Sequence, residues 1–272
     1  MTEPLLRTDG ITKRFGGFVA VDHVTTRVDE GEIVAFIGPN GAGKTTLFNL
    51  MTHMIAPTSG SVVFQGRELT HMAPHKVARL GIGRTFQDVR LFAEMTAWDN
   101  VAVFAQDLKT EKLGPGVLFP RSVLRGERAV RRRVDEVLDY LRLNDVAGVQ
   151  ADRLSFAQQK QVAIARCVAR GAKLLLLDEP ASGLDADERV EMETVVRKLV
   201  EDGVTVVLVE HNMDVVRALA TRAVFLAEGR VVADDAPDRL LALPELAEIY
   251  FGAPKKDAGT DATSSPVPQE VP

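Results

Sequence analysis

The chain has 272 residues, of which 46% are hydrophobic and 26% are charged, and its net charge is −5. This composition is that of an ordinary globular protein able to bury a sizeable core, and the acidic balance argues against strong non-specific binding to nucleic acid. The single cysteine, Cys167, excludes an internal disulfide framework and a cysteine-based zinc cluster.

The first part of the chain is predicted to alternate between strands and helices. Glycine-containing turns separate strands expected at residues 5–11, 19–28 and 32–37. A glycine-rich loop then leads into a helix expected at 43–54. A short strand at 61–65 and a helix at 74–80, with proline in its first turn, follow.

The middle of the chain, from about 93 to 169, is predicted to be mostly helical. Residues 121–142 within it carry seven arginines and four acidic residues at helical spacing, which favours a solvated face of mixed charge. After Gly171 the alternation returns, with strands expected at 174–178, 204–210, 223–227 and 230–233 and helices at 187–202 and 212–220. The whole pattern predicts an α/β nucleotide-binding core with a helical insertion.

Residues 253–272 contain four prolines and no periodic apolar residues, so we expect a disordered tail. No apolar run approaches the roughly 18 residues of a membrane helix, and the first residues lack the pattern of a signal peptide. A role at a membrane would therefore use the spans of a partner.

The loop at 38–45 matches the pattern G-x-x-x-x-G-K-[ST] between a strand and a helix. Its glycines allow backbone amides to surround phosphate oxygens, and the helix start adds a positive dipole end. Lys44 can reach the β- and γ-phosphates, and the Thr45 hydroxyl can bind Mg²⁺. A chance glycine-rich turn is the alternative, and the strand–loop–helix context disfavours it. The loop comprises Gly38, Pro39, Asn40, Gly41, Ala42, Gly43, Lys44 and Thr45.

Two apolar strands end in groups suited to hydrolysis. Asp178, at the end of the first strand, is placed to hold Mg²⁺ through water, and Glu179 can orient or deprotonate the attacking water. His211 follows the second strand and can bond the γ-phosphate. An ordinary solvated strand end is the alternative interpretation for the two acids, and a surface or satisfied core histidine is the alternative for His211.

A second helix start lies at Ser155, which forms the capping-box pattern S-x-x-Q with Gln158. The pattern is satisfied by a well-capped helix alone. Such a start also offers hydrogen bonds and positive potential to an anion. Two chains arranged head to tail can each give a loop to one ATP and a capped helix to the other.

Together these residues resemble the ABC (ATP-binding cassette) transporter ATPase family, over roughly residues 5–252. The resemblance implies a P-loop ATPase domain at 4–252, with an antiparallel β subdomain and an inserted helical subdomain at about 93–169. It implies ATP and Mg²⁺ as ligands, and it assigns roles to further residues. Gln87 resembles the Q-loop glutamine that contacts Mg²⁺ and water, His211 the switch histidine, residues 182–185 with Asp185 the D-loop at the dimer interface, Phe15 the adenine-stacking aromatic, and Thr46 continues the phosphate loop.

Residues 154–158 occupy the position of the family signature, L-S-G-G-Q. Phe156 and Ala157 stand here in place of its two glycines, while Ser155 and Gln158 match. The backbone amides remain available for phosphate, but Ala157 adds a Cβ where close approach is wanted.

Within the family, the nearest resemblance is to ATPase subunits of branched-chain (hydrophobic) amino acid importers. It is carried by residues 84–87, 90–92, 95–96, 100–101, 210–214 and 250–252. It implies a peripheral protein on the cytoplasmic face of the inner membrane, a homodimer or heterodimer with a second ATPase, permease subunits, and indirectly an extracytoplasmic solute-binding protein. Subunits for amides, urea or lipopolysaccharide look similar, so the solute stays open.

Functions other than transport have less support in the sequence. A cassette ATPase acting on DNA or ribosomes would usually carry coiled coils, tandem cassettes or basic patches, and a GTPase would carry an N-K-x-D motif; the sequence contains none of these. A weakly hydrolytic subunit of a heterodimeric pair is favoured only by the altered signature.

Overall fold

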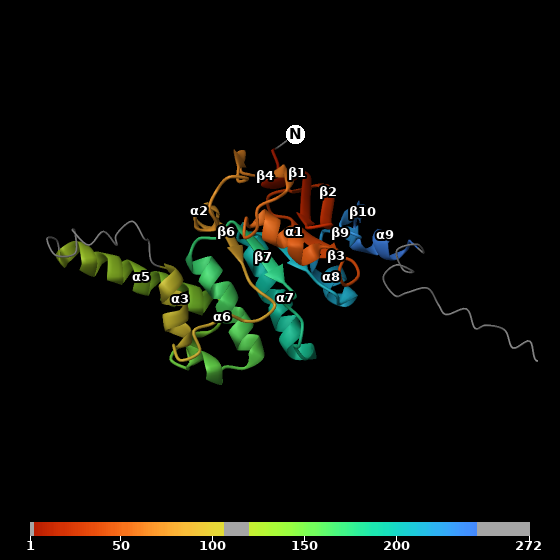
Figure 1. The fold of residues 1–272 in the computed structure, drawn as a ribbon. Helices are drawn as coiled ribbons and strands as arrows, with labels where there is room; N and C mark the ends of the chain where they lie inside the picture. The colour runs from red at the N-terminus through yellow and green to blue at the C-terminus, as the bar shows by residue number, and fades with distance from the viewer. Residues whose placement is uncertain (1–2, 106–119, 244–272) are drawn as a thin grey trace, which may run out of the picture.

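The protein is described by a computed structural model that covers residues 3–105 and 120–243 (Figure 1). Its larger sheet has six strands in the order β10-β9-β3-β8-β7-β6. The five strands from β9 to β6 run parallel, and β10 pairs antiparallel with β9 at the edge. The bounds are β3 (Ile33–Ile37), β6 (Ile82–Arg84), β7 (Leu174–Asp178), β8 (Thr205–Val209), β9 (Arg222–Ala227) and β10 (Arg230–Asp235).

The central strands are apolar along their length because both faces of the sheet are covered. In β3, Ile33 and Ala35 face one hydrophobic cluster, while Val34 and Phe36 face another. This alternation follows the two-residue period of a strand. The sheet therefore lies between two cores.

The first core lies against a four-stranded antiparallel sheet of order β2-β1-β4-β5 and against helix α1. Phe36 of the parallel sheet meets Phe48 of α1 edge to face at 6.1 Å between ring centroids. The bounds are β1 (Leu6–Phe15), β2 (Phe18–Val28), β4 (Ser59–Phe64), β5 (Arg67–Glu68), α1 (Lys44–Met51) and α2 (Pro74–Arg79). The predicted antiparallel subdomain is thus present.

The second core joins the opposite face of the parallel sheet to the helical insertion and to α7. In Figure 1, α3, α5 and α6 lie together on the side away from β1 and β2. Trp98 of α3 donates its Nε1 hydrogen to Asp135 of α5 at 2.8 Å. The bounds are α3 (Ala97–Ala105), α5 (Pro120–Tyr140), η1 (Asn144–Val146), η2 (Ala151–Arg153), α6 (Phe156–Ala169), α7 (Ala186–Glu201), α8 (Met213–Leu219) and α9 (Pro237–Leu241).

The mixed α/β class, the antiparallel sheet and the helical insertion are confirmed, with differences at element ends. β1 continues to Phe15 because Phe15 pairs with Phe18 in a tight hairpin. The helix predicted at 43–54 ends at Met51, because His53 takes a positive φ of 55° that a right-handed helix does not allow, and the Thr52 hydroxyl caps the carbonyl of Phe48. β5, β6 and α9 were not predicted. The expected disordered tail at 253–272 lies outside the described residues, and the boundaries 4–252 stay a prediction.

Among residues 3–105 and 120–243, no helix combines the length and apolarity required to span a bilayer.

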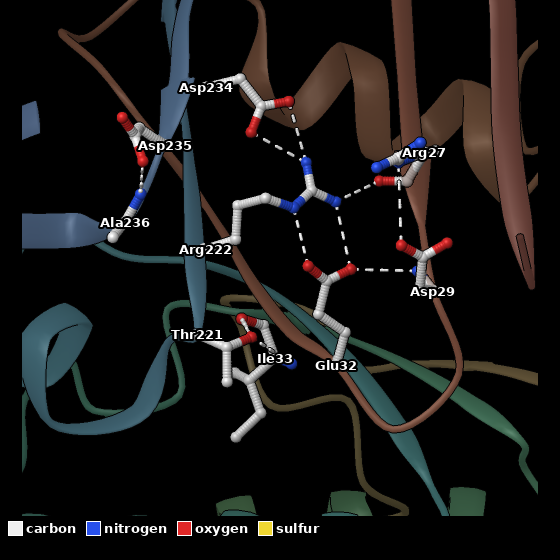
Figure 2. Close-up of polar contacts among 9 residues, drawn as sticks. All are labelled: Arg27, Asp29, Glu32, Ile33, Thr221, Arg222, Asp234, Asp235 and Ala236. Carbon is white, nitrogen blue, oxygen red and sulfur yellow. Dashed lines mark hydrogen bonds and ion pairs between the residues drawn. The ribbon is translucent and has the colours of Figure 1, made fainter. Parts of the chain in front are cut away.

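An ion-pair network around Arg222 fastens the two sheets together at one end (Figure 2). Its guanidinium bonds both oxygens of Glu32, at 2.7 and 3.1 Å, and both oxygens of Asp234, at 2.8 Å each. It also donates to the carbonyl of Arg27 on β2. Burial disfavours the charge of Glu32, but hydrogen bonds from Arg222 and the Asp29 amide hold its pKa below the ordinary value of 4.5.

We expect Glu32→Gln to lower the free energy of unfolding at pH 7 by about 1–3 kcal/mol, because Arg222 loses a charged partner. The folded-state pKa of Glu32 is depressed, so its contribution is present above the unfolded pKa and is lost as pH falls through the folded pKa. The difference in the free energy of unfolding between wild type and Glu32→Gln should therefore become smaller below about pH 4.5. Urea unfolding at pH 7 and pH 4 measures this.

Arg7→Met is the control, since the Arg7–Asp9 pair is exposed on both sides and should contribute within about 0.5 kcal/mol. If the free energies of unfolding of wild type and Glu32→Gln differ by the same amount at pH 7 and pH 4, this account is contradicted.

Candidate active site

The glycine-rich loop connects β3 to α1, as predicted. Gly38 has φ 142° and Gly43 has φ 99°, conformations that L side chains rarely adopt. A Cβ on Gly38 would lie 2.0 Å from the Leu226 carbonyl oxygen, and one on Gly43 would lie 2.4 Å from that of Ala20. The loop is therefore pressed against β9 and β2, and neither position accepts a side chain.

Lys44, the first residue of α1, folds back over this loop. Its Nζ donates to the carbonyls of Gly38 at 2.7 Å and Pro39 at 2.9 Å. Burial lowers the pKa of Lys44, while Glu179 and Asp178 act to raise it. An ammonium group thus lies between the loop and the two carboxylates, which is the place of a polyphosphate in such loops. Asn40, Gly41 and Thr45 are exposed beside it, Thr46 is half-buried, and Ala42 is packed in the core.

Glu179 is the point where the three predicted catalytic residues meet. Gln87 donates its Nε2 hydrogen to one carboxylate oxygen of Glu179 at 3.0 Å, and His211 Nε2 lies 3.0 Å from the other. The Glu179 backbone has φ 50°, in the left-handed region. The Glu179 amide donates to Val209 O at 2.9 Å, which ties this turn to the end of β8. Residues far apart in sequence therefore converge on one carboxylate.

Asp178 lies just before Glu179 and is only 7% exposed. Its carboxylate pairs with Arg84 Nη2 at 3.3 Å. Burial raises the pKa of Asp178, and Arg84 opposes that shift. A buried carboxylate oxygen close to the phosphate loop fits the oxygen ligands that Mg²⁺ prefers.

Arg84 is a site residue that the sequence analysis did not single out. It lies at the end of β6 and also donates to Asn49 Oδ1 at 2.6 Å, and its guanidinium faces the ring of Phe86 at 5.0 Å. Burial lowers its pKa while Asp178 raises it. No sequence pattern marks an arginine three residues before Gln87. Its contact with Asp178 becomes visible only in the packing of the side chains.

The start of α6 has the predicted capping box. Ser155 Oγ accepts from the Gln158 amide at 3.2 Å, and Gln158 Oε1 accepts from the Ser155 amide at 3.0 Å. Ala157 is buried in the helical core, so its methyl group packs inward. Phe156 is 44% exposed, and a Cβ on Gly183 would lie 3.0 Å from its ring. The two residues that replace glycines therefore direct side chains to their own chain.

Two further predicted residues, Phe15 and Asp185, lie at the β1–β2 hairpin and at the start of α7. Phe15 is 51% exposed at the hairpin tip between β1 and β2, and Lys13 Nζ lies 5.1 Å from its ring centroid. The same hairpin brings Ala20 against Gly43, which places Phe15 on the element that borders the loop. Asp185 caps α7 by accepting from the Glu188 amide at 2.9 Å.

Comparison with known proteins identifies the family of this chain. The ABC transporter family description matches residues 21–182. The chain belongs to the ABC transporter family. It is 38% identical, over 93% of this chain and 99% of its relative, to a protein of Pseudomonas aeruginosa named high-affinity branched-chain amino acid transport ATP-binding protein BraF.

Solved cassettes share the fold of this ABC ATPase. A nucleotide-free ATP-binding cassette from an ABC transporter has a TM-score of 0.80 and 28% identity, covering 92% of this chain and 100% of its own. A dimeric cassette in a post-hydrolysis state, bound to ADP and phosphate, has a TM-score of 0.72 and 28% identity, covering 85% and 98%. The chain is accordingly an ATP-binding, ATP-hydrolysing subunit.

We expect Arg84→Met to move the acid limb of the ATPase pH–rate profile to higher pH. Without the guanidinium, the pKa of Asp178 rises further, so the carboxylate is protonated, and less able to bind a cation, at higher pH. Steady-state ATPase assays across pH 5–8 measure the limb. Arg84→Lys keeps the charge and should shift it less; a folded Arg84→Met protein with an unmoved acid limb would overturn this role.

Proposed function

We propose that this chain hydrolyses MgATP within a head-to-tail pair of cassettes and thereby drives an importer of branched-chain or other hydrophobic amino acids. The observation that carries the proposal is the Glu179 carboxylate, held on both oxygens by Gln87 and His211 beside the phosphate loop. The name of the Pseudomonas relative supports the solute class.

In the proposed reaction, backbone amides of residues 38–46 and Lys44 hold the β- and γ-phosphates, and Phe15 stacks on the adenine. Glu179 orients the attacking water and accepts its proton. His211 donates a hydrogen bond to the γ-phosphate, and Gln87 positions the water. The attacking water would replace hydrogen bonds that the Glu179 carboxylate now makes with Gln87 and His211.

Thr45, Asp178 and Gln87 are the residues that would hold Mg²⁺. Among the described residues no cluster of three or more His, Cys, Asp or Glu side chains is arranged around a metal position. Mg²⁺ in nucleotide sites takes one or two carboxylates together with phosphates and water, so the buried Asp178 and the exposed Thr45 hydroxyl fit this ion. Bound there, it would neutralise charge on the β- and γ-phosphates.

The second cassette, an identical or a related chain, would place its Ser155 helix start over the γ-phosphate. The capping box leaves that start well ordered, and Phe156 and Ala157 turn toward their own chain. Ser155, Phe156, Ala157 and Gln158 would contribute hydroxyl, amide and side-chain contacts, and Asp185 would lie at the same interface. The dimeric relative bound to ADP and phosphate supports this arrangement.

An apolar cavity of about 320 Å³ offers a place for a cytoplasmic helix of the permease. Arg84 and Phe86 line it, and the next residue is Gln87, so an occupant would touch the segment that reaches Glu179. Its other walls include Pro74, Ala78, Phe104 and Ala172. This docking would hold the ATPase at the cytoplasmic face of the inner membrane, with an extracytoplasmic solute-binding protein acting through the permease.

Glu179→Gln tests the hydrolytic assignment. ATP affinity should stay within about threefold, because the phosphate loop is intact, while turnover should fall about a hundredfold or more without the general base. ATP-bound dimers should then accumulate in size-exclusion chromatography. Turnover at the wild-type rate would remove Glu179 from the mechanism.

Ala78→Glu tests the docking surface. A charge in the apolar cavity should abolish stimulation of the ATPase by the co-expressed permease while leaving the basal turnover of the isolated chain unchanged, because an apolar permease side chain entering the cavity would have to displace water from the carboxylate. Ala129→Glu, on the exposed face of α5, is the matched control and should leave stimulation intact. Equal stimulation in both variants would place the permease elsewhere.

A further inference from the structure

Lys160, in the second turn of α6, is a buried lysine that hydrogen-bonds no acidic side chain within residues 3–105 and 120–243. Its Nζ donates instead to three backbone carbonyls, those of Glu179 at 2.7 Å, Ser182 at 2.7 Å and Pro180 at 3.2 Å. The residue is 7% exposed. All three carbonyls belong to the turn that runs from Glu179 toward the Asp185 cap, so one ammonium group binds this turn at three points.

Glu210 binds the same turn with a carboxylate, which accepts a hydrogen bond from a backbone amide. One of its carboxylate oxygens accepts from the Ala181 amide at 2.8 Å, and the residue is 2% exposed. Burial raises the pKa of Glu210, whereas the backbone hydrogen bonds and the charge of Lys160 lower it. A cation on the carbonyls and an anion on the amide therefore fix the peptide planes of residues 179–182 between α6 and the end of β8.

The aromatic residue in the altered signature completes this contact. The Phe156 ring lies 4.9 Å from Lys160 Nζ, within cation–π range, and it covers the face of Gly183. Phe156 is the first residue of α6, while Lys160 is one turn later on the same side. The first two turns of α6 are thus attached to the whole turn that follows Glu179.

The Glu179 backbone needs such support because φ 50° is a strained conformation for a non-glycine residue. Strain of this kind persists only where neighbouring groups impose it. The Glu179 amide is bonded to Val209 O, and its carbonyl is bonded to Lys160. If the carbonyl bond is lost, the peptide is free to relax and to carry the carboxylate away from Gln87 and His211.

We propose that Lys160 is a positioning residue that couples the start of α6 to the backbone conformation of Glu179, so that the signature end of the helix and the hydrolytic carboxylate of the same chain move as one unit. This inference rests on the proposed role of Glu179. In a head-to-tail pair, the start of α6 contacts the ATP held by the partner's loop. Lys160 then links occupancy of that ATP site to the alignment of Glu179 in this chain's own site.

The test compares Lys160→Met and Lys160→Arg with wild type in the full chain. Lys160→Met removes the donors but keeps the length of the side chain. It should lower kcat for ATP about tenfold or more, which corresponds to one or two charge-assisted hydrogen bonds. The KM and the affinity for ATP should change less than about twofold, since the phosphate loop is untouched. Lys160→Arg should recover much of kcat.

Lys198→Met is the matched control. Lys198 also donates to a carbonyl, that of Tyr140 at 2.9 Å, and lies 3.8 Å from the Tyr140 ring centroid, but it is on α7 away from Glu179. It should keep the wild-type kcat. Circular dichroism melting checks that both variants fold.

A double-mutant cycle with Glu179→Gln separates positioning from general loss of structure. If Lys160 acts through Glu179, adding Lys160→Met to Glu179→Gln should lower the residual turnover less than about twofold, because the two changes remove one function. A kcat near wild type for Lys160→Met, a parallel loss of ATP affinity, or full additivity in the cycle would overturn the proposal. Inactive wild-type and Lys198→Met proteins would instead reject the proposed function itself.

Discussion

The site depends on the side-by-side order of β6, β7 and β8 in the parallel sheet. Gln87 follows β6, Glu179 follows β7 and His211 follows β8. Parallel pairing brings the carboxyl ends of these strands to one edge of the sheet, where ligands bind in open α/β folds. The two contacts on the Glu179 carboxylate are therefore a consequence of strand register. A slip of one residue in β7 would turn Glu179 to the other face.

Buried charges of both signs occupy this edge, and each one stabilises another. Lys44, Arg84 and Lys160 all have pKa values lowered by burial, and all three are drawn back toward the charged form by nearby carboxylates. Burial raises the pKa values of Asp178 and Glu210, and nearby cationic side chains oppose that rise. An isolated charge would be expelled from such surroundings, so removing one member exposes the others to an uncompensated desolvation penalty. The network is best understood as a preorganised environment for added negative charge.

The sequence predicted the features that depend on residues close together in the chain. The phosphate loop, the apolar strands and the Ser155 capping box are all set by residues a few positions apart, and each was found as predicted. Arg84, Lys160 and Arg222 were missed because their partners are 94, 19 and 190 residues away and are partly backbone carbonyls. No spacing marks such a contact. β6 was missed because three residues ending at Arg84 lack a strand period, and pairing with β7 alone makes them a strand.

The altered signature is the point where the structure adds most to the sequence. From the sequence, replacing two glycines by Phe156 and Ala157 obstructs the approach of a phosphate to the start of α6. In the structure, the Ala157 methyl is in the core, and the Phe156 ring lies against Gly183 and Lys160. The backbone amides and the Ser155 hydroxyl keep their places at the helix start. The substitution therefore changes what α6 contacts within its own chain, and a larger side chain there strengthens the attachment of the signature helix to the turn that carries Glu179.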